Sequence, residues 1–324
     1  MYVIGILMDN IESVNFKTDS SISIISSLQK KARIKLILPD TIFTESNCVY
    51  AKVSDLYIDS LNKRKYKLTN KKIINLNKLD CIFFRKDPPV DHHYLTLVQI
   101  IKELEFQNTL VLNSPDSLLK FNEKLLGYQL SNPKIPTIIG DNQKRILEFL
   151  VKHKEVVLKP TNLMAGSGII KLKYNKHAHT LVNQYIKKYK IIITQKYLKE
   201  IKNGDNRIII YNGIIEKNVL TRFPAKGDFR ANLACGGSYE ITRLNTKYLP
   251  MLDEVASFLK YYGIFFAGVD MIGKYITEIN ITSPTGVQQI RNRLSTKISN
   301  ELLKIIKKYH ELSLIHISEP TRRT

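Results

Sequence analysis

The sequence predicts an α/β fold class in its first third, with an open sheet flanked by helices, and α+β lobes in the remainder. Two observations predict this division. Short β-branched stretches alternate with amphipathic helical stretches over residues 1–121, whereas strand-like runs cluster around glycine-bearing loops after residue 122. The 324 residues, 44% of them apolar, are enough to bury a core in several lobes. We therefore expect an N-terminal α/β domain over 1–121, a small lobe over 122–200 and a C-terminal lobe over 201–312.

The first strand is predicted at Tyr2–Met8, which alternates and is rich in β-branched residues. Asp19 is a capping residue type ahead of a periodic apolar stretch, so a helix should follow it. Ser114 and Pro115 open another helix in the favoured order. The other expected elements of this domain are strands at Arg33–Leu38, Val49–Ile58, Lys67–Leu76, Cys81–Arg85 and Thr109–Leu112, and a helix at His92–Phe106.

The rest of the chain is predicted from the same two periodicities. Helices are expected from Asp141, as the cap, to Lys152, and at His177–Lys188, Leu249–Tyr261 and Ser295–His310. Strands are expected at Glu155–Lys159, Ile169–Lys173, Ile191–Thr194, Arg207–Tyr211, Ile214–Leu220, Phe265–Asp270 and Tyr275–Ile281. Residues 313–324 are predicted to be a disordered or foreign tail, because Pro320 and Arg322 break the preceding helical pattern.

The net charge of +21 has two interpretations. A nucleic-acid-binding protein would carry such a charge. However, lysine greatly outnumbers arginine, the basic residues are spread along the chain, and no nucleic-acid-binding motif accompanies them. We expect compositional bias and no nucleic-acid partner. No apolar run approaches the roughly 20 residues of a membrane span, and the cysteines Cys48, Cys81 and Cys235 form no disulfide pattern, so a cytoplasmic protein is expected.

A predicted hairpin near the C-terminus carries oxygen ligands. Asp270 ends one strand, and Glu278 and Asn280 lie two apart in the next strand, on one face. Carboxylate and amide oxygens on one rigid surface suit Mg²⁺ that bridges nucleotide phosphates. The alternative is an ordinary hairpin with polar outward residues.

Lysines and a small-residue loop form the second candidate group. Lys159 follows a strand, and the loop containing Gly166 and Ser167 returns to the next strand. Small residues let backbone N–H groups approach a phosphate. Lys124 lies on a helix that enters this lobe and could meet the same phosphates. In a chain this basic, either lysine alone would be weak support for a site.

Three further segments are candidates for ligand contacts. Gln195, Tyr197 and Leu198 follow a strand as an inter-lobe linker, whose backbone could pair with adenine. Asp205 and Arg207 would hold ribose and phosphate from a loop, unless Asp205 is a simple turn residue. The polar stretch from residue 222 to residue 237 is a candidate lid over a charged substrate, unless it is a disordered loop.

Two further segments are candidates for binding a ligand other than the nucleotide. Arg85 follows a strand of the first domain, at the edge where open α/β sheets bind ligands. Ser283, Pro284 and Thr285 follow the predicted strand that carries Glu278 and Asn280, and they offer hydroxyl and amide groups to a carboxylate.

Taken together, these segments resemble bacterial-type glutathione synthetase, a family of the ATP-grasp superfamily. The resemblance covers nearly the whole chain to about His310. It rests on segments in the family's order: Met8–Ser13, Arg85–Pro89, Asn122–Leu125, Leu158–Pro160, Gly204–Arg207, Arg230–Gly237 and Thr277–Thr285. It implies an ATP-grasp fold with an N-terminal open α/β (pre-ATP-grasp) domain.

The resemblance also implies the activity: ATP-dependent ligation of γ-glutamylcysteine and glycine through an acyl phosphate, with Mg²⁺ or alternatively Mn²⁺. It implies metal ligation by Asp270, Glu278 and Asn280. It implies ATP binding by Lys124, Lys159, Gly166, Ser167, Gln195, Tyr197, Leu198, Asp205 and Arg207. It implies catalytic roles for Arg222 and Arg230, and substrate binding by Arg85, Asn232, Ser283, Pro284 and Thr285. A homotetramer is typical of the family.

The chain departs from the family pattern where glycines are usual. Asn162, Leu163 and Ala165 occupy the phosphate loop, and Ala225 and Ala231 occupy the lid. Fewer glycines imply a stiffer lid and less room for phosphate. The alternatives are another ATP-grasp ligase that adds glutamate or joins D-alanines, a basic nucleic-acid-binding protein, and an ATP-binding protein that has lost ligase activity.

Overall fold

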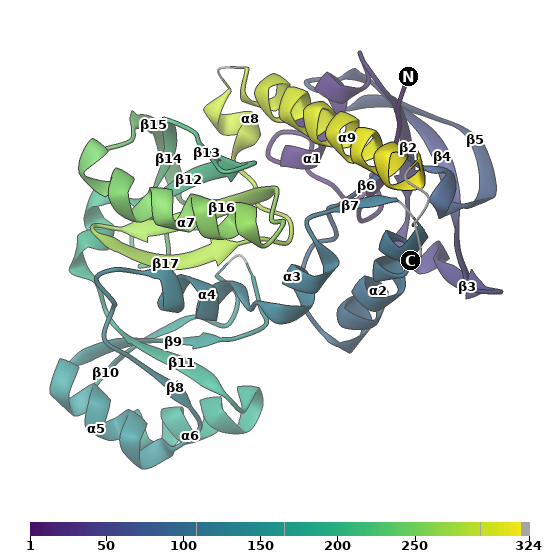
Figure 1. The fold of residues 1–324 in the computed structure, drawn as a ribbon. Coiled ribbons are helices and arrows are strands. Elements are labelled where there is room, and N and C mark those ends of the chain that lie inside the picture. Colours follow the sequence, from purple (N-terminus) through teal and green to yellow (C-terminus); the bar gives the residue numbers. More distant parts are fainter. Residues whose placement is uncertain (108, 165, 292, 319–324) are drawn as a thin grey trace, which may run out of the picture.

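The computed structural model describes residues 1–107, 109–164, 166–291 and 293–318, without the side chains of residues 313–318. Within these residues the chain forms three sheets, one after another along the sequence. Figure 1 shows the first sheet on the right, the third sheet at the upper left and the small second sheet below the third.

The first sheet has the strand order β3-β4-β2-β1-β6-β7, and β5 pairs with β4. Its strands are β1 (Val3–Leu7), β2 (Arg33–Ile37), β3 (Phe43–Glu45), β4 (Cys48–Ser60), β5 (Lys65–Asn75), β6 (Cys81–Phe84) and β7 (Leu110–Leu112). The centre is parallel, because β1 pairs with β2 and β6 and β6 with β7, whereas β4 joins β2 antiparallel. This confirms the open α/β sheet expected from the sequence.

Helices cover both faces of this sheet. They are α1 (Ser20–Leu28), α2 (His92–Lys102) and α3 (Pro115–Lys120), with α8 (Val287–Ile290) and α9 (Leu294–Ser318) from the far end of the chain. The Asp19 carboxylate accepts the Ile22 N–H at 2.9 Å and caps α1, as predicted. The long α9 returns across the first sheet and packs on α1, where Ser299 donates to the Ile24 carbonyl (Figure 1).

The second sheet has the order β10-β9-β11-β8 and is antiparallel. Its strands are β8 (Thr137–Gly140), β9 (Glu155–Pro160), β10 (Ile170–Lys173) and β11 (Ile192–Lys196), and its helices are α5 (Gln143–His153) and α6 (Ala178–Tyr189). Ile146, Leu150, Val156 and Leu158 are fully buried between helices and sheet. This small core fixes one wall of the candidate site, because the opposite face of β9 and β11 stays free for a ligand.

The third sheet has the order β15-β14-β12-β16-β17, with β13 beside β12. Its strands are β12 (Asp205–Tyr211), β13 (Ile214–Ile215), β14 (Asn218–Phe223), β15 (Ser238–Arg243), β16 (Phe266–Ile272) and β17 (Tyr275–Asn280). Helix α7 (Leu249–Tyr261) covers one face, and α4 (Glu123–Leu130) packs on β17. Gly127 permits that contact, since a Cβ there would lie 2.8 Å from the Glu278 Cα.

Several predicted boundaries were wrong. Asn142 and not Asp141 caps α5, by accepting the Arg145 N–H. Strands β8 and β15 were not predicted, since their short runs carry little apolar periodicity. The stretch predicted as one strand over Ile214–Leu220 is split into β13 and β14 by a turn.

Two predicted helix ends were also wrong. Helix α2 ends at Lys102, and a 3-10 turn at Glu105–Gln107 follows it. Helix α9 runs on to Ser318, past the end expected at His310, so part of the predicted tail is helical. Residues 319–324 lie outside the described residues.

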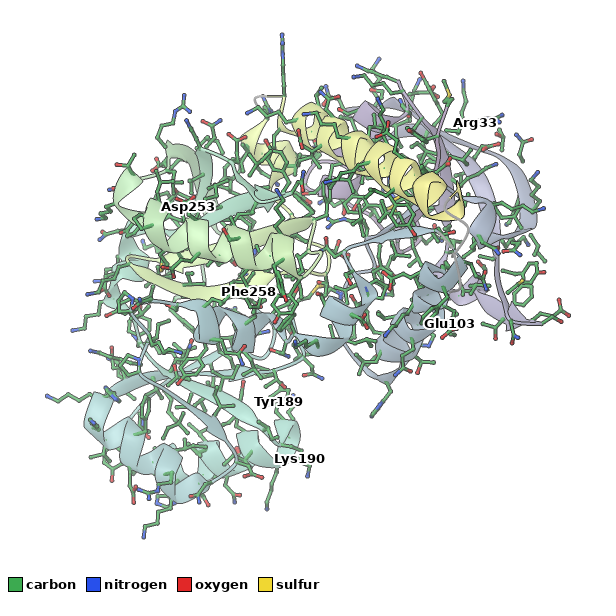
Figure 2. The ribbon with its side chains drawn as sticks, in the orientation of Figure 1. Arg33, Glu103, Tyr189, Lys190, Asp253 and Phe258 are labelled. Atoms are coloured by element: carbon green, nitrogen blue, oxygen red, sulfur yellow. The ribbon has the colours of Figure 1, made fainter. Side chains whose placement is uncertain are left out.

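Charged side chains lie on every part of the molecule. Figure 2 labels Arg33, Glu103, Lys190 and Asp253, which are all exposed and belong to different layers. This distribution agrees with a charge that is spread along the whole chain. Of the described helices, none has the length and apolar character needed to cross a membrane.

Candidate functional site

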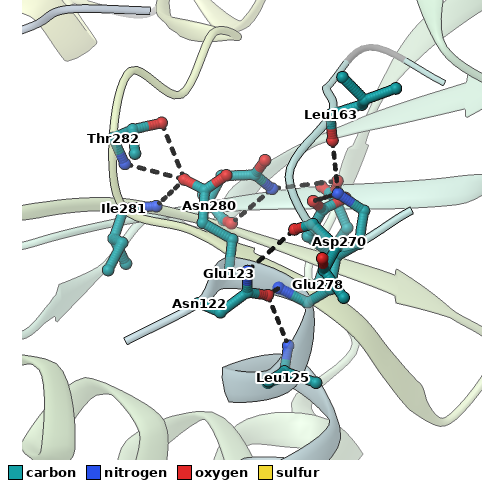
Figure 3. A network of polar contacts seen from close by, with 12 residues as sticks. Asn122, Glu123, Leu125, Leu163, Asp270, Glu278, Asn280, Ile281 and Thr282 are labelled. Carbon is teal, nitrogen blue, oxygen red and sulfur yellow. Dashed lines mark hydrogen bonds and ion pairs between the residues drawn. The ribbon is translucent and has the colours of Figure 1, made fainter. Parts of the chain in front are cut away.

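The candidate site begins with the carboxylate hairpin of β16 and β17. Asp270 and Glu278 face each other across the two strands, and the pairing shifts register directly after Asp270. The Asn280 amide Nδ2 lies 3.3 Å from Asp270 Oδ2. Glu278 instead approaches Lys124, with 3.3 Å between Oε1 and Nζ. The structure thus brings the three predicted metal ligands to one face of the hairpin, as Figure 3 shows.

Asp270 is held by two buried arginines. Arg207 donates to both of its oxygens, from Nε at 2.6 Å and from Nη2 at 2.7 Å. The Arg222 Nη2 atom lies 3.0 Å from Asp270 Oδ2 and also pairs with Asp205 at 2.5 Å. The prediction that Asp205 and Arg207 lie in a loop was wrong, because both are in β12, and Arg222 is in β14 and not in the lid. The sheet therefore holds a compact network of alternating charges.

The pKa values of Asp205 and Asp270 shift in opposite directions. Burial raises the pKa of Asp205, and Arg222 offsets this only in part. Burial also opposes ionisation of Asp270, but the guanidinium groups of Arg207 and Arg222 outweigh it and hold its pKa below that of a free aspartate. Asp270 is therefore an anion at neutral pH, while Asp205 carries a buried Oδ1 with no hydrogen-bond partner among the described residues.

These carboxylates suit a hard divalent cation. In the part of the chain that the structure describes, no three His, Cys, Asp or Glu side chains form a metal cluster. The predicted set instead combines Asp270, Glu278 and the Asn280 amide, whose Nδ2 and not Oδ1 faces Asp270 here. Each carboxylate oxygen has two lone pairs, so Asp270 can bind a cation while it accepts from arginine. The unpaired Asp205 oxygen nearby adds to this set of hard oxygen atoms, which fits Mg²⁺.

Two lysines face this group of carboxylates, one from the second sheet and one from α4. The Lys124 Nζ donates to the Leu163 carbonyl at 2.5 Å and pairs with Glu278. Lys159, on β9, makes no hydrogen bond or ion pair with any described residue. Burial lowers the pKa of the Lys159 ammonium, and the charge of Lys124 lowers it further. The charge of Glu278 offsets this lowering only in part, so a half-buried ammonium without a hydrogen bond or ion pair among the described residues is left for an anionic ligand.

The glycine loop and the segment 224–237, which we call the lid, contact each other. Arg230 pairs with Asp228 at 2.8 Å and donates from Nη1 to the Gly166 carbonyl at 3.2 Å. A Cβ on Gly166 would lie 2.8 Å from Asn232 Oδ1, so the lid lies directly on the loop. The neighbouring Ala165 lies outside the described residues.

The predicted linker lies at the other end of the same space. The Tyr197 N–H donates to the Glu155 carbonyl at 3.1 Å, so this amide is already engaged. Its ring has the Lys171 ammonium 3.5 Å from the centroid and meets Phe229 of the lid edge-on. Gln195 is buried and donates to Thr137. Of the two linker amides predicted to meet adenine, that of Leu198 remains for a ligand.

A cavity between the second and third sheets joins these groups. Its walls include most of the predicted residues: Lys124, Lys159, Gly166, Gln195, Tyr197, Leu198, Asp205, Arg230, Asn232, Asp270 and Glu278. Its apolar walls include Ile135, Val157, Ile201 and Ile272, which the sequence analysis missed because such residues look like ordinary core positions. An apolar pocket with a few converging charges is the usual form of a nucleotide site.

Other predicted residues lie outside the cavity wall. These are Ser167, Arg207, Arg222, Asn280, Arg85, Ser283, Pro284 and Thr285. Arg207 and Arg222 lie behind it and hold Asp270. Arg85 is 2% exposed and donates to Ser21 Oγ at 3.0 Å and to the Pro284 carbonyl at 3.0 Å. Its guanidinium positions residues 281–285, which we call the β17 loop.

Comparison with known proteins places this geometry in a family. Residues 3–118 match the model of the prokaryotic glutathione synthetase N-terminal domain, and residues 123–295 match that of its ATP-grasp domain. The chain belongs to the prokaryotic glutathione synthetase family. It is 36% identical over 319 residues to a glutathione synthetase of Wigglesworthia glossinidia brevipalpis, covering 95% of this chain and 98% of that one. It is 32% identical to one from Vibrio vulnificus, covering 95% and 98%.

Solved structures of lower identity share the fold. A D-cycloserine synthetase aligns with a TM-score of 0.68 at 10% identity, covering 94% of this chain and 99% of that one. D-alanyl-alanine synthetase A of Vibrio cholerae aligns with a TM-score of 0.56 at 11% identity, covering 92% and 98%. The predicted ATP-grasp fold is therefore confirmed, as is the assignment of the chain to ATP-dependent ligases that form carbon–nitrogen bonds. Such ligases use ATP and divalent metal ions in general.

Proposed function

We propose that this chain joins γ-glutamylcysteine to glycine at the cavity described above. The cysteinyl carboxylate oxygen attacks the ATP γ-phosphorus, the bond to the bridging oxygen breaks, and ADP leaves. The glycine nitrogen then attacks the carbonyl carbon of the acyl phosphate and loses a proton, and phosphate departs. The observation that carries this proposal is the unpaired Lys159 cation, which faces Asp270 and Glu278 across one cavity.

In this proposal, Lys124 and Lys159 bind the ATP phosphates as point charges. Leu198 and the apolar wall hold the base, and Gly166 lets the backbone approach a phosphate. Asp270, Glu278 and Asn280 would hold Mg²⁺, which when bound neutralises charge on the phosphate oxygens. Phosphoryl transfer needs positioning and charge neutralisation more than a protein nucleophile.

The lid would protect the acyl phosphate from water. Arg230 and Asn232 already lie on the glycine loop, so the lid would span the cavity above the phosphates of bound ATP. Arg230 would neutralise transferring charge there, whereas Arg222 would act from behind through Asp270. Excluding water matters because an acyl phosphate hydrolyses readily.

Ser167, Gln195, Tyr197, Asp205 and Arg207 stay predicted ATP contacts, and Arg85, Ser283, Pro284 and Thr285 stay predicted substrate contacts. A homotetramer and a cytoplasmic location also stay predictions. Light scattering after size-exclusion chromatography tests the first.

The test is phosphate release that depends on both γ-glutamylcysteine and glycine, compared with D-alanine pairs and glutamate acceptors. We expect turnover with the first pair and an approximately 10²-fold loss in Glu278→Gln. Glu240→Gln, on an exposed site of the same sheet, is the matched control and should retain full turnover. Unchanged turnover in Glu278→Gln would exclude Glu278 as the proposed metal ligand.

Two other results would favour the alternative functions. Salt-sensitive RNA or DNA binding without ATP turnover would favour a nucleic-acid-binding protein. Nucleotide binding without phosphate release would favour an ATP-binding protein that has lost ligase activity.

A further inference from the structure

We infer that Glu123 is a positioning residue that sets the β17 loop, residues 281–285, for the substrate whose carboxylate is phosphorylated. This inference rests on the proposed function. The Glu123 Oε1 atom accepts the Ile281 N–H at 2.7 Å, the Thr282 N–H at 2.9 Å and the Thr282 hydroxyl at 2.9 Å. Figure 3 shows this carboxylate pointing at the start of the loop.

The rest of the β17 loop is held through its carbonyls. Asn113 donates to the Ile281 carbonyl at 2.5 Å, Arg85 to Pro284 at 3.0 Å and Arg207 to Thr285 at 3.3 Å. Glu123 therefore supplies the acceptor for the loop's first amides, and the other side chains supply donors. Losing Glu123 would leave the Ile281 and Thr282 amides without their acceptor, at the point where strand β17 passes into the loop.

The place of Glu123 in the chain links this loop to the nucleotide cavity. It is the first residue of α4, directly before Lys124, which pairs with Glu278 and the Leu163 carbonyl. The cap Asn122 donates to the Thr161 carbonyl in the segment after β9. The first turn of α4 thus contacts the segment between β9 and Gly166, strand β17 and the β17 loop. A rigid turn of this kind would hold the attacking carboxylate in line with the γ-phosphate.

This role calls for more than a stability measurement. In Glu123→Ala we expect kcat/KM for γ-glutamylcysteine to fall roughly 10²-fold, since a displacement of about 1 Å at the reacting atoms can cost that much. KM for ATP should change less than about twofold, because the cavity wall keeps its charges. Hydrogen exchange of the Ile281 and Thr282 amides, measured without metal or nucleotide, should become faster.

The conservative variants separate positioning from folding. Glu123→Gln keeps an oxygen acceptor and should retain most of the dipeptide kcat/KM, whereas Glu123→Asp is shorter and should lose it. Thr282→Val removes only the hydroxyl contact and should show an intermediate loss. Glu254→Ala, an exposed glutamate of α7, is the matched control.

Two outcomes would overturn the inference. One is an unchanged dipeptide kcat/KM and unchanged exchange in Glu123→Ala. The other is an equal loss toward ATP and dipeptide that tracks a lowered melting temperature. A wild-type chain that releases no phosphate with γ-glutamylcysteine and glycine would instead overturn the proposed function, so the two failures are distinguishable.

Discussion

At the scale of single residues, the two candidate phosphate lysines differ in their surroundings. Lys124 is already paired with Glu278 and bonded to the Leu163 carbonyl. Lys159 has no such partner within the described residues, and burial lowers the pKa of its ammonium. Desolvation of this ammonium lowers the stability of the protein without a ligand, and no hydrogen bond or ion pair among the described residues compensates for it. Binding of an anionic ligand best explains such a group.

Lys159→Met should therefore weaken ATP binding without weakening the fold. We expect KM for ATP to rise about 10–100-fold, because the variant loses a charge-assisted hydrogen bond to a phosphate, and such a bond contributes about 1.5–3 kcal/mol. The melting temperature should stay the same or rise, because the variant removes a half-buried, partly desolvated ammonium that has no ion-pair partner among the described residues. Lys173→Met, at an exposed lysine paired with Glu155, is the control. A large loss of thermal stability in Lys159→Met would show that the ammonium has a structural role.

Asp270 presents the opposite case, since the fold depends on its charge. Asp270→Asn leaves Arg207 and Arg222 buried beside a neutral amide, which should lower the free energy of unfolding by about 3–5 kcal/mol in urea at pH 7. The exposed Asp253→Asn should change it little.

The pH dependence follows from the lowered pKa of Asp270. A carboxylate whose pKa is lower in the folded state stabilises the fold above its unfolded pKa of about 3.9, and loses that contribution as the pH falls toward the folded value. The difference in unfolding free energy between wild type and Asp270→Asn should narrow below about pH 4. Between pH 7 and 5 it should not narrow, because the charge of Asp270 helps to raise the pKa of the neighbouring Asp205 to about 6, and wild type gains stability as Asp205 binds a proton. A gap that already narrows near neutral pH would contradict the lowered pKa.

At the scale of elements, the glycine loop and the lid work as a pair. Their contact brings Gly166 against Asn232, and Arg230 against the Gly166 carbonyl. Position 166 therefore has little room for a side chain. The lid's own Gly227 also has a positive φ of 86°, but a Cβ there would meet nothing within 4 Å.

This pair of glycines gives a matched test. Alanine at either site costs about 1–2 kcal/mol of backbone strain, because the φ of Gly166 is 79° and that of Gly227 is 86°. Gly166→Ala additionally places a methyl group 2.8 Å from Asn232 Oδ1. We expect Gly166→Ala to lower kcat/KM for ATP by about tenfold more than Gly227→Ala. Equal losses would mean that the lid and the loop do not need this contact during turnover.

At the scale of the whole molecule, Arg85 joins the first sheet to the third. It follows β6, lies over the Phe83 and Phe266 rings at 5.4 and 4.9 Å, and donates to the β17 loop. The N-terminal domain thus helps to shape a loop that belongs to the ATP-grasp half of the chain. Together with α9, it makes the two halves one packed body.

Arg85→Met should loosen this joint. The variant keeps an apolar stem but leaves the Pro284 carbonyl and the Ser21 hydroxyl unpaired, which should cost about 1–3 kcal/mol in urea unfolding. KM for γ-glutamylcysteine should rise while KM for ATP stays near the wild-type value. Arg145→Met, at a side chain that is 73% exposed on α5, is the control. A change in KM for ATP alone would show that Arg85 serves the nucleotide and not the loop.

The sequence by itself determined the element types, the open α/β sheet and the family. Periodicity marked strands such as Val3–Leu7, and Asp19 marked the start of α1, because these signals arise from local sterics and capping. It also named half of the residues that line the cavity, because these belong to short motifs such as Asn122–Leu125 that are visible in the sequence. It missed β8 and β15, whose existence depends on a neighbouring strand and not on their own apolar pattern.

Only the tertiary structure decided which charged groups are paired. Arg207 and Arg222 stay predicted contacts of phosphate and substrate, and the structure shows in addition that strand pairing turns both toward Asp270. Glu123 lies in the Asn122–Leu125 motif, but neither it nor Asn113 was predicted to hold the β17 loop, which they contact from more than 150 residues away. Local sequence fixes the backbone preference of a segment, whereas the partner of a buried charge depends on which distant strands pack beside it.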